Sequence, residues 1–143
     1  PEGAMPAYRE ILNTKDNHAS AANNLAWLIA NDPAGDLGEA LRQAMLAKQS
    51  QPENPDIADT LGWVHFKRGT ATLAIPQFEL ALVSRPGDPT ITYHLALALH
   101  SNDQPDKARE VLRAALAESE SFQGRERAEE LLRELDKKIA EKN

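Results

Sequence analysis

Apolar positions recur at helical spacing along this chain, in paired segments separated by short polar breaks. The stretch 55–86 shows the pattern most clearly, because two apolar-periodic segments flank a break at residues 67–70. Apolar residues at intervals of three and four share one face of an α-helix. Small residues (Gly62, Ala74, Ala81) stand where two helices would approach closely, and large apolar residues stand around them (Leu61, Phe66, Phe78, Leu82). The stretch therefore predicts one helix hairpin.

The same hairpin pattern recurs on both sides of this stretch. Ala40, Ala74 and Ala108 follow one another at intervals of 34 residues, the length of one hairpin with its connecting loops. Other residues recur at equivalent positions of the repeats. Leu61-Gly62-Trp63 corresponds to Leu25-Ala26-Trp27 and to Leu95-Ala96-Leu97. Ala81 corresponds to Ala47 and Ala115, and Pro86 corresponds to Pro52. A fixed period of this length indicates an array of stacked hairpins.

The repeated unit resembles the tetratricopeptide repeat. That pattern has Leu-Gly/Ala, a turn glycine, Ala, an aromatic residue, Ala and Pro, and it is matched by Leu61, Gly62, Gly69, Ala74, Phe78, Ala81 and Pro86. The chain departs from it at Ala58, His65, Asp103 and Glu120, which replace an aromatic residue, a tyrosine, the turn glycine and the closing proline. The resemblance implies an all-α fold: a right-handed α-solenoid of antiparallel helix hairpins with a C-terminal capping helix.

This register divides the chain into one repeat domain. We expect the second helix of a partial repeat at 1–16, repeats at 17–54, 55–88 and 89–121, and a capping helix at 122–143. The first segment lacks its partner helix and would leave apolar surface exposed, which favours pairing with another copy of the chain. The last segment has an apolar stripe and otherwise charged faces. We interpret it as a solvating cap, with a partner-binding amphipathic helix or a dimer arm as alternatives.

Local signals predict where helices begin and which residues they bury. Asp36 followed by Glu39 is a capping-box-like start, and an N-cap residue precedes proline in Asn54-Pro55, Asp88-Pro89 and Asp103-Gln104-Pro105. We expect Pro76 in the first turn of its helix, where a missing N–H costs little. The helix after Asp36 should bury Leu37, Ala40, Leu41, Ala44, Met45 and Ala47.

Composition narrows the functional classes. The net charge of −6 disfavours general binding to nucleic acid. No apolar run reaches the roughly 18–20 residues of a membrane span, so direct membrane insertion is not expected. The chain has no cysteine and does not start with methionine, and we expect it to be a fragment of a longer protein.

In the tetratricopeptide family, the place held by Trp27 and Trp63 faces the concave groove. The resemblance implies a groove with an aromatic floor and an amide and carboxylate rim. The candidate partner-binding residues are Asn23, Asn24, Trp27, Asn31, Asp59, Thr60, Trp63, Phe66, Lys67, Tyr93, His94, Leu97 and His100. Aromatic anchors dominate interface energetics, so the groove would dock an extended or helical peptide. The alternative is that both indoles pack as core.

Other chemistry finds little support. Some members of the family bind the terminal carboxylate of a peptide through cations on the first helices of their repeats. The comparable positions here hold no cation, and Asp59 would repel a carboxylate. No two histidines have the i, i+4 spacing of a helical metal site, and His65 is expected to be a hydrogen-bonded core residue. There is no glycine-rich phosphate loop and no nucleophile beside a base. We therefore expect no enzyme, no cofactor and no metal.

The sequence favours a scaffold that binds a peptide or protein partner in its concave groove. The alternative is a structural, self-assembling end segment of a longer array. The series NNLAWLIA, DTLGWVHFKRG and YHLALAL is also similar to C-terminal repeats of bacterial extracytoplasmic tetratricopeptide proteins. Some of those are lipoproteins associated with exopolysaccharide and surface-sorting systems. That resemblance implies a bacterial source and a cell-envelope location.

Overall fold

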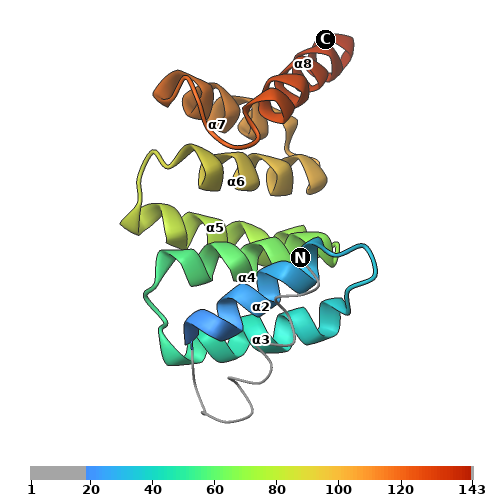
Figure 1. Ribbon diagram of the computed structural model, residues 1–143. Coiled ribbons are helices and arrows are strands. Elements are labelled where there is room, and N and C mark those ends of the chain that lie inside the picture. Colours follow the sequence, from blue (N-terminus) through green and yellow to red (C-terminus); the bar gives the residue numbers. More distant parts are fainter. Residues whose placement is uncertain (1–18, 143) are drawn as a thin grey trace.

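The computed structural model describes residues 19–142, which form helix hairpins stacked in chain order with no strand in that range (Figure 1). The helices are α2 (Ala19–Asn31), α3 (Leu37–Ser50), α4 (Pro55–Lys67), α5 (Ala71–Ser84), α6 (Pro89–Ser101), α7 (Pro105–Glu118) and α8 (Arg125–Lys142). Consecutive helices pack against each other, and α4 also contacts α2 and α6. The predicted all-α solenoid of helix hairpins is therefore confirmed. The partial repeat expected at 1–16 lies outside the described residues.

Three of the helices begin at the residues that the sequence indicates. Asp36 Oδ1 accepts hydrogen bonds from two backbone N–H groups of α3, at 2.9 and 3.2 Å. Asn54 caps α4 in the same way, and Asp88 caps α6. Each of these side chains satisfies donors that have no partner inside the helix. The predicted starts of α3, α4 and α6 are confirmed.

The expected cap of α7 is wrong. Its N-cap residue is Gln104, whose side chain makes no capping hydrogen bond. Asp103 instead adopts a left-handed conformation with φ of 56°, at the turn position that Gly69 fills with φ of 83° one repeat earlier. A short polar side chain tolerates this conformation better than most residues do. Asp103 therefore replaces the turn glycine and is not available as a cap.

A close contact between helices joins α4 to α5 within one hairpin. Phe78 is fully buried, and a Cβ atom built on Gly62 would lie 2.7 Å from a carbon of its ring. Ala26 and Ala96, the counterparts of Gly62, are also fully buried. The small residues of the repeat therefore stand where neighbouring helices leave no room for a longer side chain.

Two expectations about side chains in the second helices are wrong. Met45 is 56% exposed, because α3 turns its alanines toward the core and Met45 follows the buried Ala44 by one position. Pro76 is the sixth residue of α5 and lies beyond the first turn. Its ring nitrogen cannot donate to the carbonyl four residues earlier. Pro76 is exposed, so water can satisfy that carbonyl instead.

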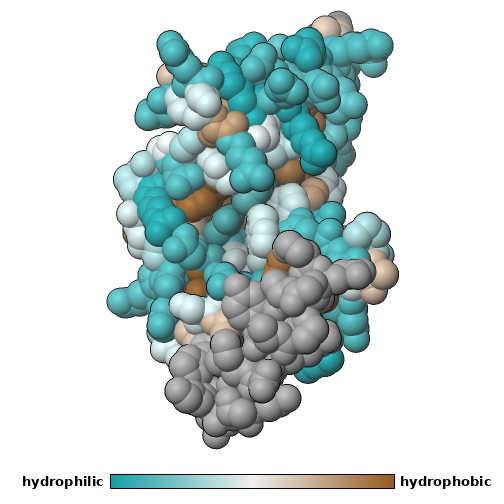
Figure 2. All heavy atoms as spheres, viewed as in Figure 1, coloured by the Kyte–Doolittle hydropathy of each residue, from teal (hydrophilic) through white to brown (hydrophobic). Residues whose placement is uncertain are grey.

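The surface is largely polar. In the view of Figure 2, hydrophilic residues cover most of the face and apolar residues appear as small, separate areas. Among residues 19–142, the exposed large apolar side chains are Met45, Leu73, Leu80 and Val83. Of the helices from α2 to α8, none is both long enough and apolar enough to cross a bilayer.

Candidate functional site

The two tryptophans lie side by side on adjacent first helices. Trp27 on α2 and Trp63 on α4 have ring centroids 5.6 Å apart, and the ring of Phe66 lies 5.3 Å from that of Trp63. Both indoles are half-buried. Trp63 packs against two clusters of core residues and is nevertheless only partly buried. The Nζ atom of Lys67 lies 5.7 Å from the centre of the Trp63 ring, within cation–π range.

Asn31 fixes the two indoles relative to each other. Its side-chain nitrogen donates to the carbonyl oxygen of Trp27 at 2.9 Å, and its side-chain oxygen accepts from the Trp63 ring N–H at 3.1 Å. The amide therefore ties the end of α2 to the middle of α4. Because the Trp63 N–H already has a partner, that indole presents mainly its apolar edge and face to another molecule.

His94 packs against both tryptophans and brings residues of three hairpins together. It is only 6% exposed, and its Nδ1 atom forms a hydrogen bond of 2.8 Å with Asp59 Oδ1 across the α4–α6 contact. Four aromatic rings surround the imidazole at centroid distances of 4.6 to 6.1 Å: those of Trp63, Phe78, Trp27 and Tyr93. The carboxylate of Asp59 is thus held by His94 and does not stand alone on the surface.

The expectation of a hydrogen-bonded core histidine at position 65 is wrong. His65 is half-buried, and its Nδ1 atom is buried without a hydrogen-bond partner in the described structure. Burial, and secondarily the charge of Arg68, lowers the pKa of His65 below its ordinary value of 6.5. His94 is the histidine that has the predicted role.

This pKa shift predicts a stability that depends on pH. The unfolded chain binds a proton at position 65 more readily than the folded chain does, so acidification below about pH 6.5 favours unfolding. We expect the free energy of unfolding to fall more steeply below that pH in the wild type than in His65→Gln, measured by urea denaturation. Parallel curves for the two proteins would contradict the assignment.

A hollow of about 360 Å³ opens beside the tryptophans. Its lining comes from α2, α4, α6, the loop before α8 and α8 itself: Trp27, Trp63, Thr90, Tyr93, His94, Gln123, Gly124 and Arg127. We call this hollow the aromatic pocket. The loop approaches closely at Gly124, where φ is +93° and a Cβ atom would lie 3.2 Å from the Tyr93 ring.

Sequence reasoning missed the C-terminal part of this pocket. Arg127 follows Tyr93 at the same interval at which Tyr93 follows Asp59, and this interval equals the repeat period. Extending the repeat register by one more step would have placed Arg127 among the groove residues. The repeat position of Asp59 and Tyr93 is therefore occupied by a cation, Arg127, in the last unit. The groove positions compared in the sequence analysis stop one unit earlier and include no cation. Helix α8 therefore contributes a residue to the lining of the aromatic pocket.

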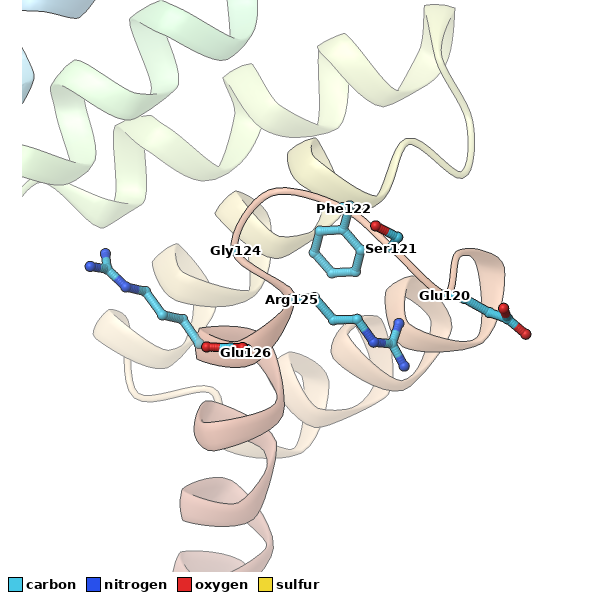
Figure 3. A pocket seen from close by; sticks show the side chains of 7 residues that line it. Glu120, Ser121, Phe122, Gly124, Arg125 and Glu126 are labelled. Carbon is cyan, nitrogen blue, oxygen red and sulfur yellow. The ribbon is translucent and has the colours of Figure 1, made fainter.

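Arg125 holds the loop between α7 and α8. Its guanidinium group donates to the carbonyl oxygens of Leu116 and Ser119 and forms an ion pair of 3.1 Å with Glu129. The side chain extends back toward the end of α7, while the loop arches over the ring of Phe122 (Figure 3). These contacts fix the loop that carries Gly124 to the aromatic pocket.

The remaining predicted groove residues differ in their accessibility. Asn24 and Lys67 are exposed, whereas Asn23, Leu97 and His100 are half-buried. Thr60 is buried, and its hydroxyl donates to the Asp56 carbonyl, so it offers little surface to a partner. Between residues 19 and 142, no three His, Cys, Asp or Glu side chains gather as a metal site would require.

Comparison with known sequences identifies the repeat. Residues 60–121 match the model of the family described as tetratricopeptide repeat. Protein FlbA from Caulobacter vibrioides is 34% identical over 95 residues, which are 64% of this chain but only 16% of that protein. The chain therefore spans a small part of this relative's length.

Solved structures share the fold. A crystal structure of MamA matches with a TM-score of 0.74 and 19% identity, covering 99% of this chain and 90% of that chain. MamA 41-end from Desulfovibrio magneticus RS-1 also matches with a TM-score of 0.74, at 20% identity and with coverage of 96% and 84%. At these identities the likeness establishes the arrangement of helices.

Proposed function

Because this chain is a tetratricopeptide repeat protein, and so in general a scaffold for protein interaction, we propose that it binds a peptide or protein segment at the aromatic pocket. The observation that carries the proposal is the adjacent, half-exposed pair of Trp27 and Trp63 on consecutive first helices. Stacked repeats offer an extended concave surface. Aromatic side chains held rigidly on such a surface supply most of the binding energy in many interfaces.

Substitution of both tryptophans tests this proposal. A phage-displayed random dodecapeptide library is selected on the wild-type chain, and the affinities of the selected peptides are then measured by calorimetry. We expect Trp27→Ala with Trp63→Ala to weaken binding at least about 30-fold, the effect of removing one interface hot spot of about 2 kcal/mol. Leu73→Ala, which removes an exposed apolar side chain from α5, is the matched control.

The measurement needs a check on folding, because Trp63 also contacts the core. Circular dichroism and urea denaturation show whether the double variant remains folded at the assay temperature. If a folded double variant binds the selected peptides as tightly as the wild type, the proposal is wrong.

The alternative function is a structural segment that assembles with other copies of the chain. It depends on the helix predicted at 1–16, which lies outside the described residues. Light scattering over a concentration series distinguishes the two, because self-assembly increases the mean mass with concentration. The cell-envelope location likewise remains a prediction from resemblance alone.

A further inference from the structure

We propose that the partner is an acidic peptide segment: a large apolar side chain enters the aromatic pocket, and a neighbouring Asp or Glu side chain binds Arg127. This inference rests on the proposed function and adds the chemistry of the partner to it. It follows from the position of Arg127, the local balance of charge and the size of the pocket.

Arg127 stands where three hollows of the surface meet. It lines the aromatic pocket, a hollow of about 460 Å³ over residues 120–127, and a hollow of about 560 Å³ along α8. Its side chain is exposed, and no described residue forms an ion pair or hydrogen bond with it. A bound peptide can therefore continue past Arg127 in either direction. This arrangement favours an acidic side chain within a peptide over a carboxylate at its end.

The charge along α8 beside Arg127 is slightly positive, although the chain as a whole carries −6. On the other side, the hollow over residues 120–127 is balanced, with two arginines and two glutamates in its lining. The hollow along α8 is lined by three cations (Arg127, Arg133, Lys137) and two carboxylates (Glu130, Glu134). No described salt bridge engages any of these five side chains. Within the aromatic pocket Arg127 is the only Lys, Arg, Asp or Glu in the lining, so an acidic side chain is favoured there and along α8.

Asp59 does not line the aromatic pocket and presents no free carboxylate to it. Its carboxylate is hydrogen-bonded to His94 at 2.8 Å, and its side chain is only 17% exposed. The repulsion expected from the sequence assumed a free carboxylate on the groove surface. In the folded chain this carboxylate is instead occupied within the protein.

The apolar part of the partner follows from the pocket itself. Its volume of about 360 Å³ lies near the lower end of the roughly 300–1,000 Å³ typical of ligand pockets, so it suits one or two side chains. The indoles of Trp27 and Trp63 and the ring of Tyr93 supply apolar and aromatic contact. A Phe or Leu side chain beside an Asp or Glu would match both parts of the site.

The experiment uses the dodecapeptides selected on the whole 143-residue chain. We expect the selected sequences to carry an acidic residue within a few positions of a large apolar one. A blocked synthetic peptide from the selection is compared with its Asp→Asn or Glu→Gln counterpart. The acidic form should bind about 3–10-fold more tightly, as expected for one charged hydrogen bond at an open site. In Arg127→Gln, this ratio should fall to about one.

Arg42→Gln is the matched control, because it removes an exposed arginine of α3 that does not line the aromatic pocket. It changes the net charge by the same amount as Arg127→Gln. If the acidic peptide and its amide counterpart bind the wild type equally, the proposal of an acidic partner is wrong, but the proposed binding at the aromatic pocket is unaffected. If a free terminal carboxylate replaces the side-chain acid without loss, the internal-segment assignment is wrong. If selected peptides bind independently of Trp27 and Trp63, or none is selected, the proposed function itself fails.

Discussion

Phe78→Ala will lower the free energy of unfolding by about 3–5 kcal/mol, the largest loss that we expect from one substitution in this chain. Phe78 is completely buried, and its ring fills the space left by the missing side chain of Gly62. The contact lies in the hairpin that packs against both of its neighbours, so the cavity would weaken the centre of the stack. Urea denaturation of both proteins at one pH measures the difference.

The coupling between Phe78 and Gly62 provides a sharper control. Gly62→Ala in the wild type forces a methyl group against the ring and should cost about 1–3 kcal/mol, even though alanine favours helix over glycine by about 1 kcal/mol. In a Phe78→Leu background the clash is relieved, and the same substitution should be neutral or stabilising. Equal effects of Gly62→Ala in both backgrounds would show that the two residues are not in contact.

Asp59→Ala should have the second largest effect on stability, with a loss of about 1.5–3 kcal/mol. The substitution leaves the His94 Nδ1 atom without its partner inside a site that is enclosed by aromatic rings. An unpaired polar group in such surroundings loses the full benefit of its hydrogen bond. Thermal and urea denaturation measure the loss directly.

Asp56→Ala is the matched control, because Asp56 lies on the same helix and pairs with Arg85 where both side chains are well exposed. An exposed ion pair contributes at most about 1 kcal/mol. In a His94→Phe background, Asp59→Ala should lose most of its effect, since the partner is already absent. A similar loss from Asp56→Ala and Asp59→Ala would show that burial of the His94 contact adds nothing.

Much of the fold could be predicted because the chain repeats itself. The equally spaced alanines establish the hairpins, and Asp36, Asn54 and Asp88 establish helix starts through contacts within a few residues. Met45 could not be placed in this way. Helical spacing gives the direction of a side chain, but the width of the buried stripe depends on how closely the next helix approaches.

The sequence predicted some residues of the candidate site and not others, and the physical reason differs from residue to residue. Trp27 and Trp63 belong to one register and were expected together. His94 was expected on the groove, and its buried bond to Asp59 depends on how two repeats pack. Arg127 was not expected at the groove, because the charged pattern of α8 resembles a cap and gives no sign that its first turn also borders the pocket.

The paired indoles also give this protein an optical property. At a separation of 5.6 Å and an inclination of 32°, we expect the excited states of Trp27 and Trp63 to be coupled. Such a dimer of chromophores produces an exciton couplet in circular dichroism, whose sign and intensity depend on the mutual orientation of the rings. Because these are the only two tryptophans in the chain, this intrinsic, label-free signal would change with any ligand that turned either ring.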